Sequence, residues 1–346
     1  MPESFFDLTE DDRKAAIKTA AATLGREYEL VEKDVWVVWT LNVLFTSEFR
    51  DSLVFKGGTS LSKAYGVIDR FSEDVDLTYD VRKLIPETTK GADLPPSKTQ
   101  ADTWTDKVKE ALPDWIATNV VPLLEEAARK LPNVQINRTE TNVHIEYGEG
   151  DSIAGYVRPR VLLEFGARST GEPAEYKDVT CDAAAVLQDF EFPIAKVRAM
   201  KPTRTFWEKA TAAHVYCVRG AFRGGDRWSR HWYDMFELDR HEFAEVAIND
   251  RALATDVADH KSRFFREKDV DYHAAISGGL RIVPESPEAF EALREDYSQM
   301  LRAGMLHGTP PAFDELIAHC RQIERRANEA AALESHTADP TPRYES

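Results

Sequence analysis

The sequence predicts an α+β protein, with a mixed sheet and flanking helices in its N-terminal lobe and a helical C-terminal lobe. Three observations lead to this fold class. Residues 53–79 have the pattern strand, glycine turn, helix, strand. Residues 134–138, 142–147 and 158–165 have strand character and predict an antiparallel extension of the same sheet. From residue 196 to about 331 the pattern is helical, so we expect a second lobe made of helices.

The chain begins with two predicted helices. Thr9 is a suitable N-cap with Asp12 three residues on, and the alanine-rich stretch that follows continues the helix to Leu24. A second helix is expected over residues 32–49, where apolar side chains recur near helical spacing. We expect this second helix to pack on the sheet.

The next predicted elements are a strand at residues 53–55, a Gly-Gly turn, a helix over 60–69 and a strand over 71–79. Side chains alternate along a strand, so Ser72, Asp74 and Asp76 should share one face. Two neighbouring carboxylates repel each other unless a cation lies between them, and Mg²⁺ prefers carboxylate oxygens together with substrate phosphate. We therefore interpret Asp74 and Asp76 as a phosphoryl-transfer metal site.

The remaining segments complete the predicted organisation. Residues 86–102 are polar and rich in Pro, Gly, Thr and Ser, which predicts an exposed loop, and a helix is expected over 104–130. The helical lobe should be interrupted at Gly224-Gly225, Gly278-Gly279 and residues 284–287. The expected domains are a lobe with N-terminal helices over residues 1–195, a helical lobe over 196–331 and a disordered tail over 332–346.

Composition limits the class of protein. The 346 residues are 42% hydrophobic and 30% charged, as in ordinary soluble proteins, and the net charge is −16. Such a charge argues against indiscriminate nucleic-acid binding but allows a local basic cleft. The three cysteines are far apart, which suggests neither a disulfide framework nor a zinc site. The sequence shows no signal peptide and no apolar run near the roughly 20 residues that span a bilayer, so a cytoplasmic protein without a membrane partner is expected.

Two further features support phosphate chemistry, each with an alternative reading. Gly57-Gly58-Thr59-Ser60 could let backbone amides approach phosphate oxygens, or could be a capped tight turn, and its closeness to the acidic pair favours phosphate. Glu164 lies in an apolar strand, where an ionised group is unfavourable unless it is paired or bound to metal. It could be the third carboxylate of a two-metal site, or could face solvent or an internal arginine such as Arg160.

A basic stretch with interleaved aromatic residues follows the last predicted strand. Cations there could contact phosphates while aromatic rings stack on bases, although a solvated helix face with core aromatics is the competing account. The candidate RNA-binding residues are Lys196, Arg198, Lys201, Arg204, Arg223, Arg227 and Arg230. A lysine in the same stretch, Lys209, could hold a triphosphate as a point charge. Asp234 alone would be read as a surface or ion-paired residue.

Four blocks of the sequence together resemble the AbiEii/MenT family of nucleotidyltransferase toxins, within the DNA polymerase β-like superfamily. The blocks are residues 56–61, 71–77, 204–209 and 230–234. The resemblance implies a two-lobed nucleotidyltransferase (EC 2.7.7 type) of a toxin–antitoxin or abortive-infection system. It also implies an NTP substrate with Mg²⁺ or Mn²⁺, a cognate antitoxin from a neighbouring gene and, in some members, a tRNA acceptor.

The resemblance also implies roles for individual residues. Gly57, Gly58, Thr59 and Ser60 would cradle phosphate with help from Ser72 and Lys63, and Asp74 and Asp76 would ligate the metal. Lys209 would hold the triphosphate, and Asp234 would act as base or orient it. Superfamily members often have Gly-Ser where this chain has Gly-Gly-Thr-Ser, so the hydroxyl that touches phosphate is left open.

The leading hypothesis is transfer of NMP from NTP to an RNA acceptor, the tRNA 3′ end being the favoured one, which would block translation and growth. One alternative keeps the fold but uses a protein or small-molecule hydroxyl as acceptor. Another is a nucleotide-binding protein without turnover. The nucleotide, the RNA, the way the antitoxin acts and the oligomeric state cannot be read from the sequence.

Overall fold

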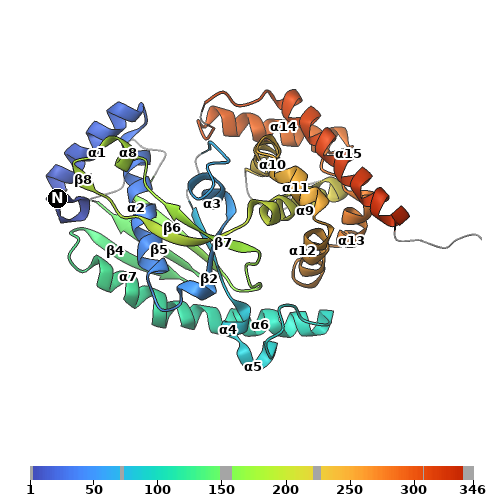
Figure 1. Ribbon diagram of the computed structural model, residues 1–346, viewed down its shortest axis with the longest axis horizontal. Coiled ribbons are helices and arrows are strands. Elements are labelled where there is room, and N and C mark those ends of the chain that lie inside the picture. The colour runs from blue at the N-terminus through green and yellow to red at the C-terminus, as the bar shows by residue number, and fades with distance from the viewer. Residues whose placement is uncertain (1–2, 71–73, 149–157, 221–226, 307, 338–346) are drawn as a thin grey trace, which may run out of the picture. The chain divides into compact units, whose positions relative to one another are not determined.

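The computed structural model (Figure 1) describes residues 3–70, 74–148, 158–220, 227–306 and 308–337. The chain forms two compact units. Unit 1 comprises residues 1–65 and 73–200, and unit 2 comprises residues 66–72 and 201–346. Unit 2 thus includes one short segment from the first part of the chain, between the predicted glycine turn and the acidic strand.

Unit 1 is built on a seven-stranded mixed sheet, which confirms the predicted α+β class. The strand order is β4-β5-β6-β3-β2-β9-β7, where β3 is antiparallel to β2 and parallel to β6. The strands are β2 Leu53–Lys56, β3 Asp74–Tyr79, β4 Val134–Thr139, β5 Asn142–Tyr147, β6 Arg160–Gly166, β7 Ala174–Val179 and β9 Ala195–Met200. Two short strands, β1 Glu3–Ser4 and β8 Phe190–Glu191, pair separately. The acidic strand β3 therefore lies at the centre of the main sheet.

Helices pack against the sheet of unit 1, as Figure 1 shows for α2 and α7. Trp36 of α2 stacks on Tyr147 of β5, and Trp115 of α6 stacks on Tyr79 of β3. The helical segments are η1 Phe5–Asp7, α1 Glu10–Leu24, α2 Tyr28–Phe45, η2 Arg50–Ser52, α3 Gly57–Lys63, α4 Val81–Leu84, α5 Pro86–Thr89, α6 Lys98–Trp115, η3 Ile116–Val120, α7 Val121–Ala128 and α8 Ala183–Val186. Thr9 caps α1 by accepting a hydrogen bond from the Asp12 amide, as expected.

Three local predictions in unit 1 were wrong. Residues 86–102 are not a continuous loop, because α5 occupies Pro86–Thr89 and α6 begins at Lys98, where Ser97 accepts a hydrogen bond from the Gln100 amide. The helix expected over 60–69 begins earlier and ends at Lys63, and Gly66 has a left-handed backbone with φ +62°. Helix α2 lies four residues earlier at both ends than expected.

The transition to helical structure also comes later than expected. Residues 195–200 form strand β9, which joins the main sheet beside β2. Ala195, Val197 and Ala199 are buried in alternation with the polar Lys196 and Arg198. The period-two pattern of a strand was therefore present, but the two cations were read as the start of a basic helical stretch.

Unit 2 consists of helices together with residues 66–72. Its helical segments are α9 Pro202–Arg219, α10 Arg230–Arg240, α11 Phe243–Asn249, α12 Arg251–Phe264, α13 Tyr272–Ala274, η4 Ala275–Gly279, α14 Pro287–Arg302 and α15 Phe313–Thr337. The indole N–H groups of Trp207 and Trp232 donate to the carbonyls of Ala247 and Ile282 inside this core. Helix α15 continues to Thr337, since its alanine-rich end favours helix, so the tail expected from 332 is helical as far as that residue.

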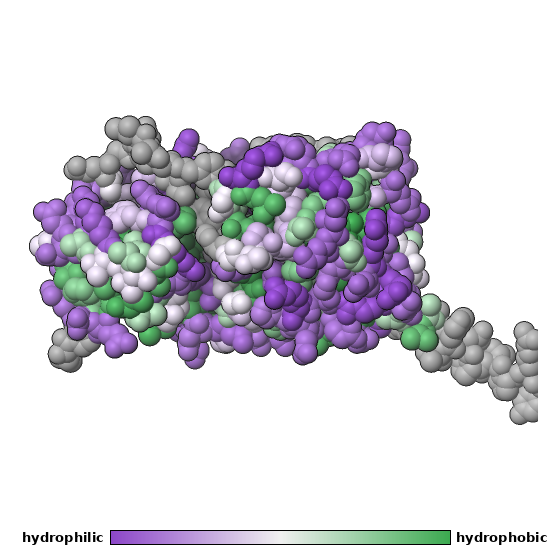
Figure 2. Space-filling view, turned by 90° about the horizontal axis from the view of Figure 1, so that it is seen from above, coloured by the Kyte–Doolittle hydropathy of each residue, from purple (hydrophilic) through white to green (hydrophobic). Residues whose placement is uncertain are grey.

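Two other expectations concern the surface. Among the described residues, no helix has the length and apolar character needed to cross a bilayer. The face in Figure 2 is mostly hydrophilic, with hydrophobic residues in separate areas. The large apolar side chains that are exposed in the described ranges are Tyr176, Ile194, Val246, Phe265, Leu301 and Leu333. The predicted interruption at Gly224-Gly225 and the tail residues 338–346 lie outside the described residues.

Candidate active site

The three candidate metal ligands, Asp74, Asp76 and Glu164, share one face of the sheet in unit 1. Asp76 of β3 lies between Lys56 of β2 and Glu164 of β6 in the strand register, and Asp74 lies opposite Leu162. The intervening Val75 is fully buried, whereas Asp74 and Asp76 are partly exposed. The alternation expected for this strand therefore brings both aspartates and Glu164 to the same side of the sheet.

Gly57 packs directly against the Asp76 carboxylate. A Cβ atom at this glycine would lie 2.0 Å from Asp76 Oδ2, and its φ of +78° is one that glycine adopts without strain. The Thr59 hydroxyl donates to the Asp74 carbonyl oxygen at 2.5 Å, and the Ser60 hydroxyl donates to the Gly57 carbonyl oxygen at 3.0 Å. The Thr59 hydroxyl thus holds the glycine turn on the acidic strand, and the Ser60 hydroxyl closes the turn on itself.

Within the described residues, these three acids do not form a ready-made metal cage. In the part of the chain that the structure describes, no three His, Cys, Asp or Glu side chains are arranged as a metal-binding group. The expected triplet of Asp74, Asp76 and Glu164 therefore shares a face without converging. Mg²⁺ commonly binds through one or two carboxylates, with water and substrate phosphate completing its coordination, so the oxygen donors present fit this ion.

Lys63, a predicted phosphate ligand, is engaged within unit 1. Its ammonium lies 2.6 Å from Asp34 and 2.9 Å from Asp182, and the side chain is 13% exposed. Burial alone would lower the pKa of Lys63, but the two carboxylates outweigh it and raise the pKa. This lysine ties α3, which follows the glycine turn, to α2 and to the residue before α8.

Lys209 and Asp234 meet in unit 2, together with a cation that the sequence analysis missed. Asp234 is fully buried, and its two carboxylate oxygens lie 2.6 Å from Arg70 Nε and 2.9 Å from Arg70 Nη2. The Lys209 ammonium lies 2.6 Å from Asp234 Oδ2. Arg70 belongs to the segment 66–72, whose backbone also bridges to Leu306.

The charges of this cluster perturb one another. Burial tends to raise the pKa of Asp234, but Arg70 and Lys209 outweigh it and hold that pKa well below its usual range. The pKa of Lys209 is lowered, chiefly because burial disfavours its charged form, and Asp234 offsets part of the effect. Asp234 is therefore an ionised carboxylate that two cations share.

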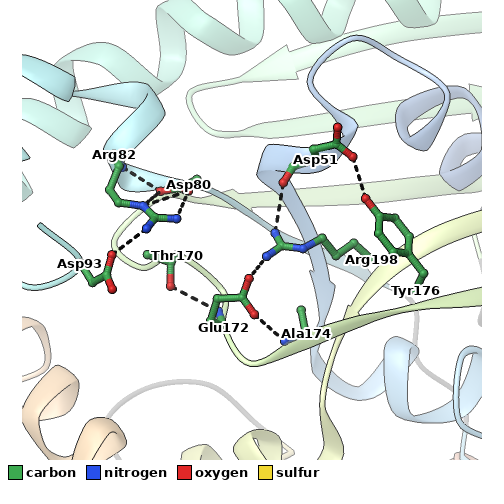
Figure 3. Close-up of polar contacts among 9 residues, drawn as sticks. All are labelled: Asp51, Asp80, Arg82, Asp93, Thr170, Glu172, Ala174, Tyr176 and Arg198. Carbon is green, nitrogen blue, oxygen red and sulfur yellow. Dashed lines mark hydrogen bonds and ion pairs between the residues drawn. The ribbon is translucent and has the colours of Figure 1, made fainter. Parts of the chain in front are cut away.

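The predicted RNA-binding residues do not form one group. Lys196 and Arg198 lie on β9 in unit 1, where Arg198 pairs with Glu172 and donates to the Asp51 carbonyl (Figure 3). Arg204 is buried in unit 2 beside Glu208 at 3.3 Å, whereas Lys201 is exposed.

The other predicted RNA-binding residues that the structure describes, Arg227 and Arg230, have different surroundings. The Arg227 amide donates to Asp296, and Arg230 begins α10 with a partly exposed side chain. Ser72 and Arg223 lie outside the described residues. The basic stretch therefore mixes ion-paired residues with exposed ones.

The family of the chain follows from comparison with known proteins. Residues 39–319 match the family described as "Nucleotidyl transferase AbiEii toxin, Type IV TA system". The chain belongs to this family. It is accordingly a nucleotidyltransferase toxin, and an antitoxin partner and an NTP substrate follow from that membership. A search of curated proteins gave no match.

Among solved structures, the chain is similar to MenT4, a nucleotidyltransferase toxin from Mycobacterium tuberculosis H37Rv. The two sequences are 20% identical, and the match covers 94% of this chain and 99% of the other. Their TM-score is 0.39, so the two structures superpose only loosely and no residue role is transferred from MenT4.

Arg70 is the main residue of the site that the sequence did not identify. Arg70 lies four residues before Asp74 in a chain of net charge −16, and a cation so close to the acidic pair was the only hint of its role in the sequence. Its partner Asp234 is 164 residues away in sequence, so no local pattern could pair the two.

The first prediction concerns the contact between Gly57 and Asp76. Gly57→Ala should displace the Asp76 carboxylate and lower nucleotidyl transfer by at least about 100-fold, since a shift of about 1 Å in an active-site group can cost that much. Gly25→Ala is the matched control, because Gly25 has φ +64° with no atom near its missing Cβ. Equal activity of the two variants, at equal thermal stability, would show that the close contact does not matter.

The second prediction concerns Arg70. Arg70→Ala leaves the buried Asp234 with one cation and should lower the free energy of unfolding by about 3–5 kcal/mol. Arg70→Lys should recover only part of this loss, because an ammonium cannot replace the bidentate hydrogen bonds of the guanidinium to Asp234. Urea titrations measure both variants, with the exposed Arg138→Ala as control. A loss below about 1 kcal/mol for Arg70→Ala would contradict the assigned role.

The third prediction concerns acid stability. The folded-state pKa of Asp234 is depressed, so its stabilisation is present above the unfolded pKa of about 3.9 and is lost as pH falls through that value toward the folded pKa. The stability difference between wild type and Asp234→Asn should therefore shrink between about pH 5 and pH 2. Urea unfolding across this range checks it, with the exposed Asp114→Asn as control. A difference independent of pH would argue against an ionised Asp234.

Proposed function

We propose that the protein transfers NMP from an NTP to the 3′-hydroxyl of an RNA, with tRNA as the favoured acceptor, using Mg²⁺ held by Asp74 and Asp76. The observation that carries the proposal is the row formed by Lys56, Asp76 and Glu164 against the side-chain-free Gly57. Family membership supplies the reaction class. The resulting loss of acceptor function in tRNA would block translation and growth.

The candidate site residues of unit 1 have distinct roles in the proposed reaction. Asp74 and Asp76 supply oxygen ligands for Mg²⁺ or Mn²⁺, and Glu164 is the candidate for a third. The bound ion neutralises charge on the triphosphate and on the reacting oxygens. Gly57 and Gly58 lack side chains, so the turn lets phosphate approach the backbone next to Asp76.

Thr59, Ser60 and Lys63 act mainly by positioning. The hydroxyls of Thr59 and Ser60 already donate to backbone carbonyls, and the Lys63 ammonium is already held by two carboxylates. Their contribution is to fix the turn and the strand that carry the ligands. Preorganised groups of this kind lower the barrier because they need not move when the reaction occurs.

Lys209 is the proposed contact for the triphosphate, and Asp234 orients it. A carboxylate with a depressed pKa and with both oxygens already bound to Arg70 and Lys209 is a poor proton acceptor. Of the two roles considered for Asp234, orientation of Lys209 therefore fits better than that of a base. Asp234 is bound to Arg70 through both oxygens, so it compensates the charge of Lys209 only in part.

Phosphate binding by the basic stretch is proposed for its exposed members. Lys201 is exposed and Arg230 is partly exposed, and within the described residues neither has an ion-pair partner. Arg198 and Arg204 are committed to Glu172 and Glu208, so their charges are partly neutralised. RNA recognition through this stretch is thus expected to rest on fewer cations than its composition indicates.

The fourth prediction tests the reaction. Wild-type protein should label total tRNA with at least one α-³²P NTP in the presence of Mg²⁺, and Asp74→Asn or Asp76→Asn should reduce labelling by at least about 100-fold because charge stabilisation is lost. Asp178→Asn, an exposed aspartate on β7 of the same sheet, is the matched control and should retain activity.

The acceptor atom is tested by periodate oxidation, which destroys the 3′-terminal diol of tRNA. Oxidised tRNA should take up no label. Uptake by oxidised tRNA would exclude the 3′-hydroxyl, and absence of RNA labelling with all four NTPs would refute the proposed acceptor. Label found on protein or on a small molecule would instead support the alternative acceptors, and absence of pyrophosphate release would support nucleotide binding without turnover.

A further inference from the structure

Two polar side chains lie beside the acidic residues on the same face of the sheet in unit 1. Asp74 is opposite Leu162 of β6, and Leu162 is opposite His144 of β5. Arg160 lies two residues before Leu162 and therefore points to the same side. Adjacent strands are about 4.8 Å apart, which puts the backbone of His144 about 10 Å from that of Asp74.

Both side chains have unused hydrogen-bonding capacity. The Nδ1 atom of His144 is buried and has no hydrogen-bond partner. In the described part of the chain, the Arg160 guanidinium has neither a hydrogen bond nor an ion pair. A buried polar atom without a partner is unfavourable and uncommon, and beside the proposed site a bound ligand can supply the partner.

The nearest carboxylate on this face does not neutralise Arg160. Glu146 of β5 lies opposite Arg160 in the strand register, but its carboxylate accepts a hydrogen bond at 3.1 Å from Asn137 of β4. No ion pair joins Glu146 to Arg160 within the described residues. The positive charge of Arg160 is therefore available to an anion on the sheet face.

The strand order separates this pair from the glycine turn. Lys56 and Gly57 lie on the β2 side of Asp76, whereas Arg160 and His144 lie on the β6 and β5 side of Asp74. The triphosphate, in the proposed function, approaches at the glycine turn. The acceptor hydroxyl must reach the α-phosphate from another direction, and Arg160, Leu162 and His144 on the β5–β6 side of the same face are partly exposed.

We propose that Arg160 and His144 form the acceptor subsite and bind the phosphodiester next to the attacking 3′-hydroxyl of the RNA. The inference rests on the proposed function, since it presupposes an RNA acceptor. A guanidinium matches two phosphate oxygens, and an imidazole N–H can donate to a third or to the ribose. One nucleotide spans the distance from Asp74 to this pair, so the contact fixes the terminal nucleotide beside the metal ligands.

The experiment compares RNA and NTP kinetics. Arg160→Ala should raise the apparent KM for tRNA about 10-fold or more, leave the KM for NTP within about twofold, and reduce the salt dependence of RNA binding by about one phosphate contact. Arg160→Lys should retain part of the affinity, and His144→Ala should show a smaller effect of the same kind. Arg138→Ala on β4, where the exposed arginine donates to the Glu140 carbonyl, is the matched control.

An uncharged linkage in the RNA tests the contact between Arg160 and the phosphodiester in the wild-type protein, so a folding defect of a variant cannot explain the result. An RNA oligonucleotide with the 3′-terminal sequence of the labelled tRNA carries a methylphosphonate at its last linkage. This change should weaken RNA binding by the wild type several-fold and RNA binding by Arg160→Ala hardly at all. An equal penalty in both proteins, or an unchanged KM for tRNA in Arg160→Ala, would overturn the subsite. If wild type labels no RNA at all, the proposed function itself fails, which is a separate result.

Discussion

The close packing of the glycine turn on the acidic strand of unit 1 depends on the absence of a side chain at Gly57. The strand that carries Asp74 and Asp76 runs beside the turn so closely that the Asp76 carboxylate occupies the space of a Cβ atom. Thr59 fixes the same turn to the Asp74 carbonyl, and Lys63 ties the following helix to Asp34 and Asp182. A phosphate that reached the turn would thus meet backbone and carboxylate oxygens whose positions are already set.

In unit 2 a single carboxylate has a comparable role. Asp234 binds Arg70 through both oxygens and Lys209 through one, and all three side chains are buried. Burial of an ion pair gives little net stability by itself, but loss of one member is strongly unfavourable. The arrangement therefore restricts where the Lys209 ammonium can lie more than it strengthens the fold, which suits the triphosphate contact proposed for this lysine.

Much of this could be predicted from the sequence, and the exceptions have physical reasons. The alternation in residues 74–76 and the Thr9 cap depend on neighbouring residues, so local patterns were sufficient. Strand β9 was missed because Lys196 and Arg198 occupy its polar positions and were interpreted as charge alone. Arg70, and the parallel pairing of β3 with β6 that places Glu164 and His144 on the same face as Asp74, depend on contacts between distant segments, which a single sequence does not contain.

The assignment of residues 66–72 to unit 2 has a consequence for synthesis of the chain. The ribosome makes Arg70 early, but its carboxylate partner appears 164 residues later. Until then the connection between the glycine turn and the acidic strand lacks its anchor. A nascent or truncated chain ending at strand β9 would carry Asp74 and Asp76 without that anchor, so the pair of Arg70 and Asp234 forms only when most of the polypeptide has been made.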